Sequence, residues 1–378
     1  MKVKAFICAF VTLLLVCPGL VSAQGDVQNV EDYVGKGKVT SLHLLGAKAA
    51  SMAMEELSFA RGNDHVLAMT DAGYAMIGGK TTEKCIDGVT AVSGCTIGNG
   101  NLLLIHRGKE QPLWFAFFRK DTKDLIYLEV KESVIGKSVS EFYTLSGAEI
   151  FTKISKTNIG LDDLVNNPDK WTENVKNEIF GGNEFSLIGI ANIWSNPKCS
   201  YDFLQAVQLH NHVCPGVSSG YLIIKYLDKK LPLQRGQRYK IIACPPWCKE
   251  DAFQAILDTT VGKRGLYVKG LTKEQKEKLP QEAKGIAGLY IRWDDKTGSG
   301  EGLALGFDFG EVRKLAGMEN YLGPPWVSKL KMNEIAMNYL DKPETMVTTL
   351  KRFTVNADEL AALQAAGINP LVEIGLMQ

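Results

Sequence analysis

The fold is decided by a stretch that occurs twice, KCIDGVTAVSGCTIGNGNL over residues 84–102 and CKEDAFQAILDTTVGKRGL over residues 248–266. Laid over each other without gaps, the two copies pair Asp87 with Asp251, Thr96 with Thr260, Gly98 with Gly262 and Leu102 with Leu266. Similarity within one chain at a fixed spacing is the signature of a structural repeat. The sequence therefore predicts two degenerate tandem repeats.

The flanking sequence predicts the same order of elements around each copy. Apolar periodicity predicts helices over 41–61 and 84–94 with strands over 65–70, 101–106, 112–119 and 125–130, then helices from about 200, from Pro215 and over 249–260 with strands over 238–244, 265–269, 286–293 and 303–309. Leu42-His43 opens the helix over 41–61, and Leu209-His210 stands at the matching place before the helix from Pro215. The fold class that follows is α+β, with helices packed on a mixed β-sheet in each repeat.

The predicted organisation has five parts. They are a signal peptide over 1–23, a degenerate repeat over 24–159, a helical connecting segment over 160–198, a second repeat over 199–315 and a C-terminal helical extension over 316–378. Within the extension, Asn356 and Glu359 have the spacing of a helix cap.

The N-terminus predicts export. Lys2 and Lys4 precede a mostly apolar run over 5–20, and Val21-Ser22-Ala23 supplies the small residues that a signal peptidase cuts. We place the mature start near Gln24 and expect the protein in the periplasm. A retained membrane anchor is the alternative, although the apolar run is short for a membrane span.

The charge balance argues against nucleic acid as a partner. Lys and Arg total 43 against 42 Asp and Glu, a formal net charge of +1. Binding to nucleic acid needs a concentrated positive field, which this balance does not provide.

Metal-competent residues gather in the second repeat. The run HNHVCPG over 210–216 contains two of the five histidines, and imidazole and thiolate are the usual ligands of zinc. Pro215 suits the first position of a helix, so Cys214 is expected just before it. A thiol at a helix N-terminus favours the thiolate, and we expect the pKa of Cys214 to lie below its ordinary value.

A second cluster, CPPWCKED, spans 244–251. Cys244 follows an apolar strand and Cys248 precedes a helix, so both thiols stand where ligands commonly converge. The candidate metal ligands are His210, His212, Cys214, Cys248 and Cys244. A Cys244–Cys248 disulfide is the alternative, because exported proteins form disulfides.

These motifs carry a resemblance to a known family. His210 with His212-Val213-Cys214-Pro215-Gly216 resembles the H-G-H-x-C-P-G signature of FmdE, a family of formylmethanofuran dehydrogenase proteins, and Cys248 with Asp251-Ala252, Gln254 and Gly262-Lys263 resembles its next signature. The resemblance implies an α+β fold with a mixed sheet and a metal site at the HxHxC and downstream Cys positions. Members look like dimers, so two fused repeats are expected to form an internal pseudo-dimer.

The departures from the family pattern limit what is carried over. The first repeat has Lys84 where the ligand Cys belongs and Leu44-Leu45-Gly46-Ala47 in place of the ligating stretch, so we expect it to have lost the site. The second repeat has Thr259 where the family commonly has Cys, and the family's C-terminal four-Cys zinc module is missing. Export is a further departure, and formylmethanofuran chemistry is not transferred to this chain.

The sequence favours a periplasmic protein that binds a transition-metal ion, most simply zinc, with nickel, copper and iron as alternatives. Such a protein would store, deliver or sense the ion, or bind a small-molecule metal complex. One alternative is a metalloenzyme with an open coordination position and Asp251 or Glu250 as acid/base. Another is thiol redox chemistry at Cys244 and Cys248. A monomer with an internal pseudo-dimer and a homodimer are both open.

Overall fold

The computed structural model describes residues 18–377. Most of the predicted signal peptide lies outside these residues, and the last part of it begins α1 (Pro18–Val34). Within residues 18–377, no helix combines the length and the apolar character that crossing a bilayer requires.

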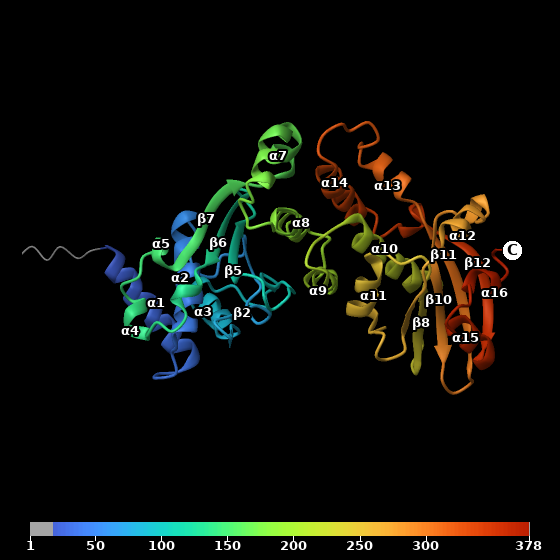
Figure 1. The fold of residues 1–378 in the computed structure, drawn as a ribbon, viewed down its shortest axis with the longest axis horizontal. Coiled ribbons are helices and arrows are strands. Elements are labelled where there is room, and N and C mark those ends of the chain that lie inside the picture. Colours follow the sequence, from blue (N-terminus) through green and yellow to red (C-terminus); the bar gives the residue numbers. More distant parts are fainter. Residues whose placement is uncertain (1–17, 378) are drawn as a thin grey trace, which may run out of the picture.

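The first repeat is a five-stranded mixed sheet with helices on one face (Figure 1). The strand order is β4-β1-β5-β6-β7, with β1 and β4 parallel and every other neighbouring pair antiparallel. Its elements after α1 are α2 (Ser41–Glu56), β1 (Val66–Thr70), β2 (Met76–Ile77), β3 (Lys80–Thr81), α3 (Lys84–Ser93), β4 (Leu102–Leu104), β5 (Trp114–Arg119), β6 (Asp124–Val130), α4 (Val139–Phe142), α5 (Gly147–Ile150) and β7 (Phe151–Asn158).

The second repeat has the same sheet, ordered β9-β8-β10-β11-β12, and again only the first pair is parallel. The connecting helices are α6 (Leu161–Asn166), α7 (Pro168–Lys176) and α8 (Glu184–Trp194). The repeat itself consists of α9 (Tyr201–His210), α10 (Pro215–Lys230), β8 (Gln237–Ala243), α11 (Lys249–Leu257), β9 (Leu266–Val268), α12 (Lys273–Glu277), β10 (Ile286–Asp294), β11 (Ser299–Phe307), α13 (Phe309–Leu315), α14 (Pro325–Asn338), β12 (Val347–Asn356), α15 (Ala357–Gln364) and α16 (Pro370–Glu373).

The strand register confirms the repeat that the sequence predicts. Ala68 of β1 lies beside Leu102 of β4, and Ile241 of β8 lies beside Leu266 of β9. Leu102 and Leu266 are the residues that end the duplicated stretch. The unit β1-α3-β4 is therefore the counterpart of β8-α11-β9, and the α+β class with a mixed sheet in each repeat is confirmed.

Close helix contacts show which helices correspond. A Cβ on Gly46 of α2 would lie 2.0 Å from the carbonyl oxygen of Cys85 in α3, and one on Gly220 of α10 would lie 2.7 Å from that of Lys249 in α11. Cys85 and Lys249 occupy the same place in the duplicated stretch, so α2 corresponds to α10. Each glycine is the sixth residue after its helix N-cap, and these N-caps are Thr40 and Cys214.

This correspondence corrects the predicted alignment of Leu42-His43 with Leu209-His210. His43 lies inside the first turn of α2, whereas His210 ends α9, the helix before α10. The error arose because both dipeptides stand near a helix start in the sequence. Helix packing, which the sequence does not display, decides which positions are equivalent.

The predicted C-terminal helical extension over 316–378 is wrong in one element. Residues 347–356 form β12, which pairs with β11 along the edge of the second sheet. The strand mixes β-branched and charged residues because its edge position leaves much of it exposed, so it lacks a strong apolar signal. The predicted cap is confirmed, since Asn356 Oδ1 accepts hydrogen bonds from the N–H groups of Asp358 and Glu359.

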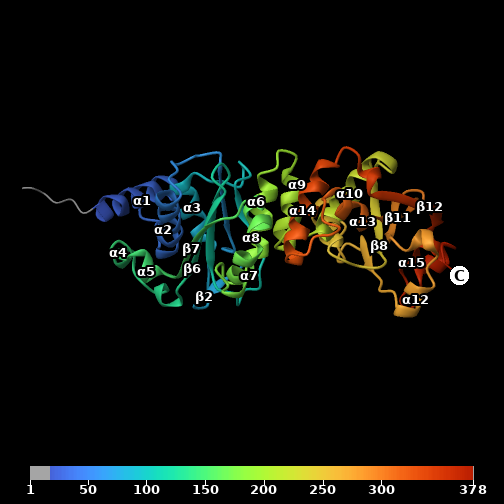
Figure 2. The same cartoon turned by 90° about the horizontal axis from the view of Figure 1, so that it is seen from above.

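The two repeats stack head to tail, as Figures 1 and 2 show along the long axis of the molecule. Ala68 packs in a core with α2 and α3, while its neighbour Met69 enters a central core between the repeats. In the second repeat the counterpart of Ala68, Ile241, enters the central core, and Ile242 faces an outer core under α15 and α16. Opposite faces of the two sheets therefore meet across the central core.

Candidate metal centre

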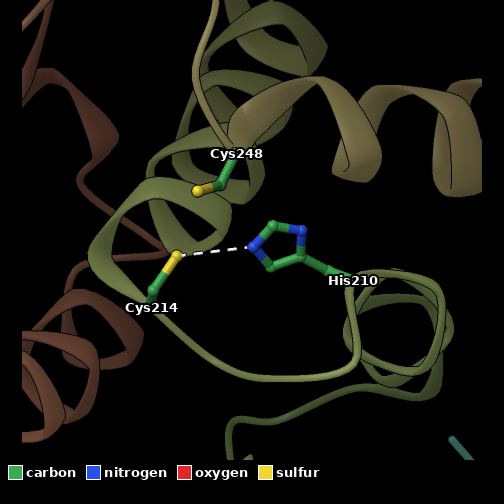
Figure 3. Close-up of side chains that lie close together, drawn as sticks. All are labelled: His210, Cys214 and Cys248. Carbon is green, nitrogen blue, oxygen red and sulfur yellow. Dashed lines mark hydrogen bonds between the residues drawn. The ribbon is translucent and has the colours of Figure 1, made fainter. Parts of the chain in front are cut away.

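Three metal-competent side chains converge in the second repeat. One ligand atom from each of His210, Cys214 and Cys248 lies within 4.8 Å of the others. His210 ends α9, Cys214 is the N-cap of α10, and Cys248 is the N-cap of α11. Figure 3 shows both sulfur atoms on the same side of the imidazole, with His210 Nε2 3.6 Å from Cys214 Sγ. This donor set is compatible with a transition-metal ion.

Local backbone chemistry brings the first two ligands together. Asn211 takes the left-handed conformation, with φ of 58°, and so ends α9 immediately after His210. Cys214 is extended, as a residue before proline prefers to be, and Pro215 starts α10. The Asn333 Nδ2 of α14 donates a hydrogen bond to the carbonyl of Val213 at 3.1 Å, which anchors the short loop between the helices.

Gly216 allows the third ligand to approach. A Cβ at this position would lie 2.9 Å from Cys248 Cβ and 3.1 Å from its sulfur. Any larger residue would therefore push α11 away from α10. Glycine at this position of the HxHxCPG run therefore has a steric role, because a side chain there would force the Cys214 and Cys248 thiols apart.

Asp251 orients the histidine ligand. Its Oδ2 lies 2.7 Å from His210 Nδ1, which leaves Nε2 directed toward Cys214. A carboxylate that holds the distal nitrogen of a ligating histidine sets the tautomer and the orientation of the ring. Asp251 was a candidate acid/base from the sequence, and its hydrogen bond favours this supporting role instead.

We expect the Asp251→Asn variant to keep the fold and to bind metal about 10- to 100-fold more weakly, because second-layer partners of ligating histidines have effects of this size. Competition with a chromogenic chelator measures the change. Asp258→Asn is the matched control, since Asp258 is exposed at the other end of α11. Equal affinities in the Asp251 variant and the wild type would contradict the orienting role.

The pKa values of the two converging thiols are shifted in opposite directions. Hydrogen bonds from Cys214 and His210 lower the pKa of Cys248 below its ordinary value. The hydrogen bond to Cys248 and burial raise the pKa of Cys214 well above its ordinary value. The expected lowering at Cys214 is therefore wrong, because these two effects outweigh the helix N–H groups of Val217 and Gly216 that act on it.

The two histidines differ in charge. Burial disfavours the cation at His210, but hydrogen bonds to Asp251 and Cys248 raise its pKa to about 9. Burial, followed by the positive charge of His210, lowers the pKa of His212 to about 4. A metal ion held by all three side chains must displace the protons of both His210 and Cys214, because the ligands are a neutral imidazole and thiolates.

Two predicted ligands lie outside the group of three. His212 stacks obliquely on His210, with ring centroids 4.2 Å apart, and its Nδ1 lies 3.0 Å from Asn211 Oδ1. Cys244 is fully buried in the outer core, on the opposite face of the second sheet from α10 and α11. The strand alternation that directs Ile241 and Ala243 to the central core turns Cys244 away from the site.

All six described cysteines are free, and no Cys244–Cys248 disulfide forms in the part of the chain that the structure describes. The thiols that the fold brings together are instead those of Cys214 and Cys248. A redox partnership of Cys244 with Cys248 therefore gains no support from their placement.

A buried ion pair beside Cys248 was not foreseen from the sequence. Lys249 is fully buried, with its Nζ 2.5 Å from Glu250 Oε1 and 3.5 Å from the centre of the Trp247 ring. Burial lowers the pKa of Lys249 to about 8. A Lys-Glu dipeptide at a helix start usually lies in solvent. The neighbouring Trp247 is therefore the one feature of the sequence that could have indicated a buried ion pair here.

The first repeat lacks this donor set. Thr40 stands at the place of Cys214, and Lys84 stands at the place of Cys248. His43 Nε2 lies 3.9 Å from Asp87 Oδ2, so only the histidine–carboxylate pair has an analogue. Among residues 18–377, the group in the second repeat is the one that gathers three such ligands.

Comparison with protein families agrees with these features. The family model described as "FmdE, Molybdenum formylmethanofuran dehydrogenase operon" matches residues 37–175 and 209–295, more than half of the chain. A search of curated proteins found no match. The matched segments contain both copies of the duplicated stretch and all three converging side chains, and the chain belongs to the FmdE family.

Proposed function

We propose that this chain is an exported protein that binds one transition-metal ion through His210, Cys214 and Cys248. The convergence of one imidazole and two thiols within 4.8 Å supports the proposal. The hydrogen bond that His210 Nδ1 donates to Asp251 Oδ2 adds the support that ligating histidines usually have. Handling of a metal ion or a metal complex is the function that follows.

Three protein donors leave room for an exogenous ligand on the ion. Sites with two cysteines and one histidine that keep an open position are typical of zinc that acts on small molecules, whereas closed four-ligand sites are structural. Zinc is the metal we favour, because thiolate and imidazole together suit it. When bound, the ion would supply positive charge and Lewis acidity at this place.

Export remains part of the proposal. Its support is the basic, apolar and small-residue order of residues 1–23. Cleavage after Ala23 would leave most of α1, including Val30, which is buried against the core of the first repeat. Intact mass measurement of the protein from the periplasmic fraction tests this: a start near Gln24 supports export, and an uncut chain in the cytoplasm contradicts it.

Metal analysis of the purified mature protein tests the site. We expect about one equivalent of zinc after anaerobic purification or reconstitution, since one three-donor group is present. The Cys244→Ser variant is expected to bind the same amount, because Cys244 lies in the outer core. A protein with reduced thiols that takes up no zinc, nickel, copper or iron would overturn the proposal.

A further inference from the structure

A polar cleft opens between the two repeats beside the metal ligands. It has a volume of about 430 Å³, and its walls come from the loop after β4, the start of α8 and the loop after α9. His212 is part of its wall, and the ring of His212 lies 4.2 Å from that of His210. A cleft of this size matches a small organic molecule.

The first repeat is held in place at this cleft by backbone contacts with α9. The N–H of Leu104 donates to Gln208 Oε1 at 2.8 Å, and the N–H of His106 donates to the Gln208 carbonyl at 3.0 Å. These bonds tie the end of β4 and the loop after it to the last turn of α9, just before His210. Arg107, the next residue in the loop, lines the same cleft as His212.

The charged residues that line the cleft favour an anionic ligand. Arg107 is its one charged side chain apart from the titratable His212, and no Asp or Glu lines the cleft. The Arg107 Nη2 donates to Gln111 Oε1 at 3.1 Å, and within residues 18–377 the guanidinium makes no ion pair. Asp71 interacts electrostatically with Arg107. This carboxylate is fully buried and is not one of the residues that line the cleft. A guanidinium with free N–H groups is suited to bind a carboxylate in a bidentate manner.

The rest of the lining suits a flat organic group. The rings of Phe185 and His212 lie 5.5 Å apart between centroids and form an aromatic wall. Asn211 and the nearly fully buried Asn183 also line the cleft; Asn183 Nδ2 donates to the carbonyl oxygens of Phe180 and Gly181, and Asn211 Oδ1 lies 3.0 Å from His212 Nδ1. The cleft thus offers one cationic end, hydrogen-bonding groups and an aromatic surface.

We propose that this cleft binds a small planar carboxylate, which the first repeat recognises through Arg107 while the second repeat holds the metal. The inference deepens the proposed function and rests on it, because it assigns a ligand class to the cleft whose wall includes His212, the neighbour of the candidate ligand His210. It also gives the first repeat a role, although that repeat lacks the ligand set. The carboxylate lies on Arg107, and the planar remainder lies along Phe185 and His212.

Benzoate is the probe, since it combines a carboxylate with a flat ring and has no other donor. Isothermal titration calorimetry is carried out with the mature full-length protein in its zinc-loaded and metal-free forms. The variants are Arg107→Gln, Arg107→Lys and the matched control Arg235→Gln, which alters an exposed arginine outside the cleft.

We expect benzoate to bind the wild type and Arg235→Gln equally, and Arg107→Gln at least about 10-fold more weakly, because a charge-assisted bidentate contact is lost. Arg107→Lys should recover part of the affinity, since lysine keeps the charge but not the fork. Zinc content should be the same in all four proteins.

Two results would overturn the proposal that the cleft binds a planar carboxylate. They are the absence of measurable binding by the wild type at millimolar benzoate, and equal affinity of the wild type and Arg107→Gln. Gln111→Ala provides a second variant that leaves the arginine in place, and we expect it to weaken benzoate binding as well. Loss of zinc with retained benzoate binding would count against the metal site and not against the cleft, so the two failures are distinguishable.

Discussion

Replacing either Cys214 or Cys248 by serine is expected to lower the bound metal from about one equivalent to below about 0.1, because a neutral hydroxyl replaces a soft anionic ligand. Both sulfur atoms face His210 Nε2 from helix N-termini, and no fourth described His, Cys or acidic side chain belongs to the group. Two remaining donors would hold the ion weakly. Metal analysis after reconstitution and desalting measures the loss.

Cys199→Ser is the matched control for these variants. Cys199 is a free, partly exposed cysteine of the same repeat and lies outside the ligand group. It should keep one equivalent of metal, and near-ultraviolet circular dichroism should show that all the variants keep the native fold. Full metal content in both Cys214→Ser and Cys248→Ser would refute the three-ligand site.

Gly88→Ala is expected to destabilise the first repeat by about 3 kcal/mol or more, at the upper end of overpacking costs. A Cβ at Gly88 of α3 would lie 1.9 Å from the carbonyl oxygen of His43 and 2.8 Å from the backbone nitrogen of Ala47. Both atoms belong to the backbone of α2, so rotamer changes cannot relieve the clash. The two helices must separate and weaken the core that they share with β1.

Gly98→Ala is the control for this effect, because the nearest atom to a Cβ there is Thr96 Oγ1 at 3.9 Å. Its stability should remain within about 0.5 kcal/mol of the wild type, as is usual for surface substitutions. Urea unfolding followed by circular dichroism compares the three proteins. If Gly88→Ala unfolds at the same urea concentration as Gly98→Ala, the close contact of α2 and α3 is not required.

Local signals in the sequence predicted most elements of the two repeats. Apolar periodicity and turn residues give α3, α10, β8 and β10 close to their observed bounds. They miss β7 and β12, which form the outer edges of the two sheets. An edge strand exposes polar residues on both sides, so the alternation that marks a half-buried strand is weak.

Three of the five predicted ligand residues converge. Tertiary packing decides which of the five lie in the group and which do not. Their residue types and motifs identified His210, Cys214 and Cys248, because proline, glycine and helix starts leave local marks in a sequence. The exclusion of Cys244 depends on which face of the second sheet its side chain takes. The supporting role of Asp251 depends on the distance between α9 and α11, which lie 41 residues apart at this contact.

By itself, the sequence determined the repeat, the α+β class and the cluster of metal-competent residues, because each of these depends on short-range patterns. Only the tertiary structure decided that the repeats stack head to tail, that the thiols of Cys214 and Cys248 converge on His210, and that Arg107 of one repeat lines the same cleft as His212 of the other. These features arise where segments distant in the chain pack together. Burial, charge and hydrogen bonding at such contacts are properties of the folded chain, and no local pattern encodes them.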